Sequence, residues 1–305
     1  LLQLAVARAL IGFGVSACLM AALKAFSQWY PPQHYASMTG QIMAAGALGA
    51  ISSTLPLELA LPLFGWRGVF VAVALAGVAI LLLIAVLVPD HPDDRHSGAH
   101  ADDQSVATIF RSPVFWRFAP QAALFGGGLM AMQSLWSLPF LTSVAGLDRM
   151  LAAEHLMAVN LGMLAGQLSI AAVAARLLRH GVTPQLMMEA GLALVVGIEA
   201  AIIVLAGGGL ALWFLWGVAS ATSAQVYGVV ASRFPQSLSG RAATAVNLMA
   251  FIGAFAVQWG YGVAIDLLEG MSLSTATAHR ITLGSLAILQ GAAFLPLIGK
   301  RNGRH

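Results

Sequence analysis

The feature that most constrains this chain is a succession of nine long apolar runs separated by proline, glycine and charged residues. The runs fall at 4–28, 36–60, 67–88, 113–141, 152–177, 184–206, 209–231, 241–268 and 279–299. About 20 apolar residues are enough for a helix to cross the hydrocarbon core of a bilayer. A helix also satisfies its backbone hydrogen bonds within one segment, as lipid requires. The pattern therefore predicts nine transmembrane helices.

Composition supports an all-α polytopic membrane protein. Hydrophobic residues make up 59% of the chain and charged residues 9%, whereas soluble domains carry about 25% charged residues. The 32 glycines fall largely inside the apolar runs, where small residues let membrane helices approach closely. A soluble enzyme is excluded. Most of the 15 lysines and arginines are scattered along the loops, so we expect no nucleic acid as a partner.

One hydrophilic segment divides the apolar runs unequally. Residues 90–104 are rich in aspartate and histidine. We therefore predict three parts: an N-terminal part at 1–89, a hydrophilic linker at 90–111 and a C-terminal six-helix half at 112–305. The spacing of the linker histidines does not match a tetrahedral metal site, and we expect neither a metal nor a cofactor.

The distribution of positive charge predicts the topology. If the linker is cytoplasmic, 11 lysines and arginines are cytoplasmic, and only Arg67, Arg149 and Arg280 lie on the opposite side. Short cytoplasmic loops carry an excess of lysine and arginine. The linker and the C-terminus are therefore predicted to be cytoplasmic, in a protein of the bacterial inner membrane. Nine crossings place residue 1 on the far side.

Several motifs in the chain resemble those of a known family. The first apolar run contains a leucine, an arginine and two glycines separated by three, three and one residues: Leu4, Arg8, Gly12 and Gly14. They resemble a motif in the fourth helix of the major facilitator superfamily. The stretches 65–70 and 234–241 are similar to the entries into the sixth and eleventh helices of that family.

The resemblance implies a twelve-helix fold of two six-helix halves. The three runs before the linker then correspond to helices four to six, and we expect the first three helices to be absent from this chain. The implied function is secondary active transport of a small solute by alternating access, as a symporter and a monomer. A coupling proton is left open as a further partner.

Other functions are less favoured. The family's antiporter motif contains a proline that the stretch 46–53 lacks, so a drug or metabolite efflux antiporter is the alternative. A channel needs a pore lining repeated around an axis, which a chain with two distinct halves does not suggest. No hydrolase elbow or zinc-protease motif occurs in the sequence, so we predict no enzyme activity.

Polar residues inside the predicted helices are candidates for substrate contact. Gln133 and Trp136 are three positions apart, and Asn160 and Gln167 are seven apart, so each pair shares a helix face. The alternative for both pairs is helix packing, because interhelical hydrogen bonds join membrane helices. Packing is favoured for the glycines between Asn160 and Gln167.

The last helices carry further candidates. Ser220, Ser223 and Tyr227 form a polar stripe that suits a wet cavity, and Asn247 and Gln258 share a face at a spacing of eleven residues. All five residues belong to helices that line the family's central cavity.

Arg8 and Glu199 are charged residues inside predicted spans. Other charged residues are expected near span ends, where they can reach water: Glu58, Lys24, Glu189, Asp266 and Glu269. Arg8 keeps its charge inside a bilayer, and it either couples transport or binds backbone carbonyls of a neighbouring helix. Glu199 is expected to have a structural partner rather than to carry protons. With one arginine and no carboxylate facing the cavity, the substrate is predicted to be a small organic anion or metabolite.

Overall fold

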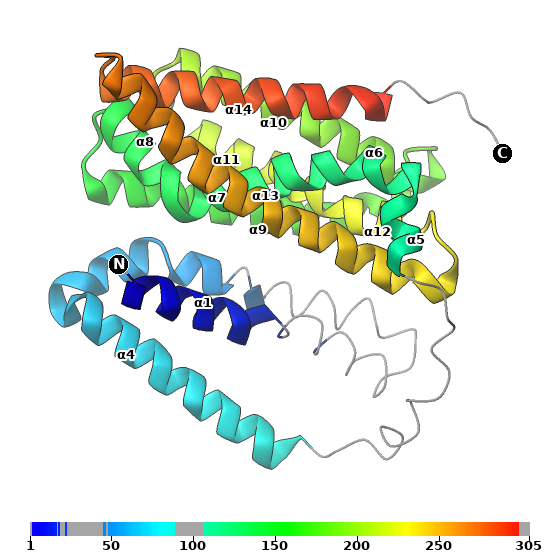
Figure 1. The fold of residues 1–305 in the computed structure, drawn as a ribbon, viewed down its shortest axis with the longest axis horizontal. Helices are drawn as coiled ribbons and strands as arrows, with labels where there is room; N and C mark the ends of the chain where they lie inside the picture. The colour runs from blue at the N-terminus through cyan, green and yellow to red at the C-terminus, as the bar shows by residue number, and fades with distance from the viewer. Residues whose placement is uncertain are drawn as a thin grey trace. The chain divides into compact units, whose positions relative to one another are not determined.

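The computed structural model describes residues 2–16, 18, 22, 45–46, 48–88 and 106–298. Within these ranges the chain is helical, with turns between the helices and no strand. The helices succeed one another along the chain as shown in Figure 1. The chain forms two compact units, the first made of residues 1–49 and 63–100 and the second of residues 50–62 and 101–305.

The first unit contains α1 (Leu2–Ser16) and most of α4 (Leu55–Leu87). The backbone leaves helical geometry inside α4 at Gly65, with φ 64° and ψ 164°. Only glycine adopts such a conformation without strain. This break lies between two of the predicted apolar runs, and Pro62, a predicted breaker, precedes it.

The second unit holds the six helical segments expected after the linker. The short helix α5 (Val106–Arg111) precedes them, within the predicted linker, whose residues 90–105 lie outside the described residues. The first segment runs through α6 (Pro113–Gln121), η2 (Ala122–Gly126), α7 (Gly127–Ala131), η3 (Met132–Trp136) and α8 (Ser137–Val144). The others are α9 (Arg149–Arg179), α10 (Pro184–Val204), α11 with η4 and α12 (Leu210–Ser220, Ala221–Ala224, Gln225–Ala231), α13 (Gln236–Gly270) and α14 (Thr275–Ile298).

Local sequence explains where these segments begin. Ser112 caps α6 by accepting a hydrogen bond from the backbone N–H of Val114, and proline follows at the first helical position. Thr183 caps α10 in the same way, again with proline next. The cap of α9 is Asp148, whose carboxylate accepts from the backbone N–H of Leu151 at 2.8 Å. The segments therefore start at the breakers that separated the apolar runs.

Glycine permits close approach between α9 and α11. A Cβ atom added at Gly162 would lie 2.1 Å from the carbonyl oxygen of Phe214, and one added at Gly217 would lie 2.1 Å from that of Val159. No side chain fits at such separations. The two helices thus touch backbone to backbone, as the small residues near Asn160 predicted.

The first segment is unusual because η2 and η3 are π-helical turns. A π-helical turn hydrogen-bonds to the fifth residue along instead of the fourth, and such turns occur frequently at functional sites. Gly253 of α13 lies against η2, since a Cβ there would be 2.0 Å from the carbonyl oxygen of Ala123. The widened turns change which side chains share a face of this segment.

The outer surface of the described helices is apolar. In the described part of the chain, five helices are long and apolar enough to cross a membrane: Leu55–Leu87, Pro184–Val204, Leu210–Ala231, Leu238–Gly270 and Thr275–Leu297. Large hydrophobic side chains such as Leu267 and Ile288 remain exposed on them, as lipid contact requires. The protein is therefore an integral membrane protein. The number of nine crossings is not confirmed, because the described residues contain these five.

Candidate functional site

The second unit contains an open cavity of about 940 Å³. Its walls come from the segment 50–62, the helical segment 113–144, α9 and α13. Most of the lining is apolar. The polar lining residues are Ser53, Thr54, Glu58, Gln133, Ser134, Asn160 and Gln258. A large, mostly apolar cavity with a few convergent polar groups is the usual form of a small-molecule site.

Two amide side chains meet in this cavity. The Gln133 side chain donates from Nε2 to Asn160 Oδ1. Asn160 in turn donates from Nδ2 to the carbonyl oxygen of Leu156 at 3.1 Å. Asn160 is buried and Gln133 is half-buried. The pair therefore fixes the orientation of both amides at the cavity wall.

A third amide lines the cavity from α13. Gln258 donates from Nε2 to Ser134 Oγ at 2.7 Å, and that hydroxyl donates to the carbonyl oxygen of Met130 at 2.6 Å. Three of the candidate residues, Gln133, Asn160 and Gln258, thus line one cavity from three different helical segments.

Trp136 lies outside this lining. Its indole N–H donates to the backbone carbonyl of Gln258 at 3.0 Å, and its ring stacks on Tyr261 with the centroids 4.8 Å apart. The π-helical turn η3 contains both Gln133 and Trp136. Because that turn holds more residues than an α-helical turn, a residue three positions on no longer shares the face.

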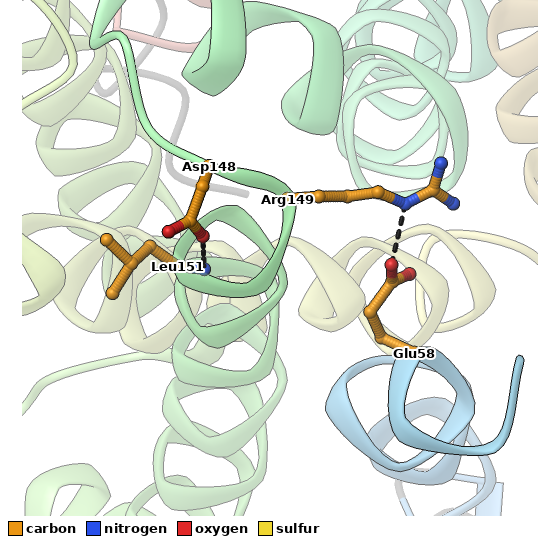
Figure 2. Close-up of polar contacts among 4 residues, drawn as sticks. All are labelled: Glu58, Asp148, Arg149 and Leu151. Carbon is orange, nitrogen blue, oxygen red and sulfur yellow. Dashed lines mark hydrogen bonds and ion pairs between the residues drawn. The ribbon is translucent and has the colours of Figure 1, made fainter. Parts of the chain in front are cut away.

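The cavity contains a carboxylate. Glu58 lines it, and its Oε1 accepts from Arg149 Nε at 2.6 Å, as Figure 2 shows beside the Asp148 cap of α9. The prediction that no carboxylate faces the cavity is therefore wrong. Glu58 lies near the end of an apolar run in the sequence, and its approach to the cavity depends on tertiary contacts that the sequence alone does not display.

The Glu58–Arg149 ion pair makes a small contribution to stability. The Arg149 side chain is 63% exposed, and exposed ion pairs contribute roughly 0.2–1 kcal/mol. The Arg149 guanidinium partly neutralises the Glu58 carboxylate, so Glu58 presents less net negative charge to the cavity than an unpaired acid would.

A second polar cluster lies apart from this cavity. It contains Glu199, Trp216, Ser220, Ser223 and Gln290, and the gap between them has no room for a water molecule. The predicted stripe thus places Ser220 and Ser223 in a packed interior. Sequence analysis missed Gln290, a single amide in an apolar run whose position gives no indication of a partner.

The remaining candidates join helices or lie elsewhere. Tyr227 donates its hydroxyl hydrogen to Asn247 Oδ1 at 3.1 Å. Gln167 donates from Nε2 to the carbonyl oxygen of Ala221 at 3.3 Å. Arg8 is exposed on α1 in the first unit. None of these four residues is part of the cavity lining described above.

The described residues contain no group of three or more histidine, cysteine, aspartate or glutamate side chains that could hold a metal ion. The linker histidines His91, His96 and His100 lie outside the described residues.

The chain matches the model of a known family. A family model described as "Major Facilitator Superfamily" matches residues 1–257. The match extends from α1 through the predicted linker into α13, and so includes every residue that lines the cavity except Gln258. No curated protein matches the chain.

Proposed function

Because this chain belongs to the major facilitator superfamily, we propose that it is a secondary active transporter that carries a small polar solute across the membrane by alternating access. Membership and the apolar helices make it a membrane transporter.

The observation that carries this proposal is the convergence of Gln133, Asn160 and Gln258 on the large cavity. Each amide offers both hydrogen-bond donors and an acceptor. The polar groups of such a site replace the water molecules that hydrate a polar solute, and the apolar lining accommodates the solute's carbon skeleton. We propose that these three amides bind the transported solute.

The cavity narrows the predicted substrate class. The sequence favoured a small organic anion because one arginine and no carboxylate were assigned to the cavity. Glu58 lies in the lining, and its partner Arg149 is neutralised by it. Neutral amides and hydroxyls make up the rest of the polar lining. We therefore favour a small, uncharged polar metabolite over an anion.

Uptake into proteoliposomes tests the proposed function. Proteoliposomes that contain the protein are preloaded with one unlabelled solute at a time, from a panel of polyols, sugars, amides and organic acids. They should show saturable exchange of that solute for its labelled form. Exchange of an uncharged member is the expected result. Uptake that stays linear with concentration for every member, or single-channel current, would support a pore instead.

The proposed orientation has a separate test. We expect the linker, and with it the C-terminus, to be cytoplasmic. In a Cys18→Ser background, a Ser97→Cys protein in intact cells should resist a membrane-impermeant thiol reagent and react after lysis. Labelling before lysis would reverse the topology.

A further inference from the structure

Glu199 lies in the C-terminal third of α10 with almost no contact with solvent. Its side chain is 2% exposed, and it lies among Phe125, Leu129 and Val195. One carboxyl oxygen, Oε1, accepts a hydrogen bond from the indole N–H of Trp216 at 3.1 Å. The expected structural partner of Glu199 is therefore present, but it serves only one of the two oxygens.

Two buried oxygens in this cluster lack a hydrogen-bond donor. They are Glu199 Oε2 and Gln290 Oε1. The Gln290 amide is oriented by its other end, because Nε2 donates to the carbonyl oxygen of Leu124 at 3.2 Å. The cluster therefore contains two oxygen atoms that could each accept a hydrogen bond and receive none. An ionised carboxylate in such a place would be buried without a cation and with one hydrogen bond, an arrangement that proteins avoid by neutralising the group.

Among the described residues, no other charged group lines the cluster around Glu199. The residues that surround its carboxyl group contain no second titratable side chain. On the helices packed against α10, the titratable groups are Tyr227 on α12 and His279 and Arg280 on α14, while α11 and η4 have none. The segment 113–144, which contributes Phe125 and Leu129 to the cluster, has Arg117 on α6. Glu189, the other acid of α10, is occupied by a hydrogen bond from Gln185. None of these groups lines the cluster.

We propose that Glu199 is an enclosed proton-binding site, protonated while the helices around it are packed, and that Gln290 connects this site to the helical segment 113–144. Protonation gives the cluster a hydroxyl donor where it has unused acceptors. When the proton leaves, the O–H bond breaks, the carboxylate keeps the electron pair and water takes the proton. Because the packed gap admits no water, this exchange requires the helices to separate.

The segment 113–144 connects the proton site with the substrate cavity. Gln290 donates to the carbonyl oxygen of Leu124 within η2, and Leu129 packs in the proton site. The next residues, Met130 and Gln133, line the cavity. A shift of the segment 113–144 at the proton site would therefore also move residues that line the substrate cavity. The proton site stands on its own geometry, whereas its use in transport rests on the proposed function.

Infrared spectroscopy of the purified protein tests the protonation directly. At about pH 7, where a model glutamate is ionised, the wild type should show a protonated-carboxyl band that moves in D₂O. Glu199→Gln should lose this band, and the matched variant Glu189→Gln should keep it. If Glu199→Gln does not fold, Gln290→Leu should shift the frequency of the same band. A band retained in Glu199→Gln, or unmoved in Gln290→Leu, would overturn the proposal.

Thermal unfolding gives a second measurement that needs no substrate. A carboxyl that is protonated when folded and ionised when unfolded makes the protein less stable as the pH rises. Between about pH 6 and about pH 9, the melting temperature of the wild type should fall by roughly 5 °C more than that of Glu199→Gln. Parallel melting curves would overturn the proposal, whether or not the protein transports any solute tested.

Hydrogen exchange tests the connection through Gln290. After correction for the intrinsic pH dependence of exchange, amides of residues 122–136 should exchange faster at about pH 9 than at about pH 6 in the wild type. The difference should vanish in Glu199→Gln and shrink in Gln290→Leu. Equal protection at both pH values in the wild type would contradict the connection.

Discussion

Replacement of Gly217 by alanine is expected to destabilise the second unit by roughly 3 kcal/mol or to prevent its assembly. The added methyl group would lie 2.1 Å from the carbonyl oxygen of Val159 and 3.0 Å from the backbone nitrogen of Met163. Both atoms belong to the backbone of α9, which cannot rotate away as a side chain can. The helices α9 and α11 would have to separate, and Asn160, which lines the cavity from α9, would move with them.

Gly197 is the matched control for this substitution. It lies inside α10, and a Cβ atom there meets no heavy atom within 4 Å. Alanine favours a helix over glycine by about 1 kcal/mol, so Gly197→Ala should leave the melting temperature unchanged or raise it. Thermal unfolding of the two purified variants compares them. Equal melting temperatures would mean that α9 and α11 do not approach as closely as described.

The second large effect is expected on transport. Gln133→Leu should lower the rate of solute exchange at subsaturating concentration at least about tenfold, which corresponds to the loss of one or two hydrogen bonds to the solute. The variant should fold, because leucine has a similar volume and α9 remains held by its contact with α11. Exchange in proteoliposomes and thermal unfolding should be measured on the same preparation.

Gln167→Leu is the control for this variant. Gln167 is also an amide on a membrane helix, but it binds the carbonyl oxygen of Ala221 and lies outside the cavity lining. Gln167→Leu should lower the thermal stability of the protein and leave the affinity of the folded protein for the solute unchanged. If Gln133→Leu behaves in the same way, Gln133 is a packing residue, and the amide cluster is not the substrate site.

Much of the helical architecture could be predicted from the sequence. The run at 184–206 corresponds to α10 (Pro184–Val204), and the run at 209–231 corresponds to Leu210–Ala231. These ends are set locally, by proline at the start of one helix and by the glycines at 207–209 between the two. The helix α9 (Arg149–Arg179) is longer than its apolar run because its charged ends also remain helical.

The site was harder to predict, because its geometry depends on tertiary contacts. Gln133 and Trp136 would share a face of an α-helix, but the π-helical turn between them separates the two side chains, and no local residue pattern marked that turn. Glu58 was placed at a helix end facing water, whereas it lines the cavity. Asn160 and Gln258 were found because a polar group in an apolar run is itself informative.

The most direct test of the central claim, that the amide-lined cavity binds the transported solute, is protection of a cysteine placed within it. In a Cys18→Ser background, Ser134→Cys puts a thiol in the cavity lining, and Ser232→Cys puts one at the exposed end of α12, outside it. A solute that exchanges in proteoliposomes should slow maleimide labelling at position 134 and leave labelling at position 232 unchanged. Equal labelling at position 134 with and without saturating solute would contradict the claim.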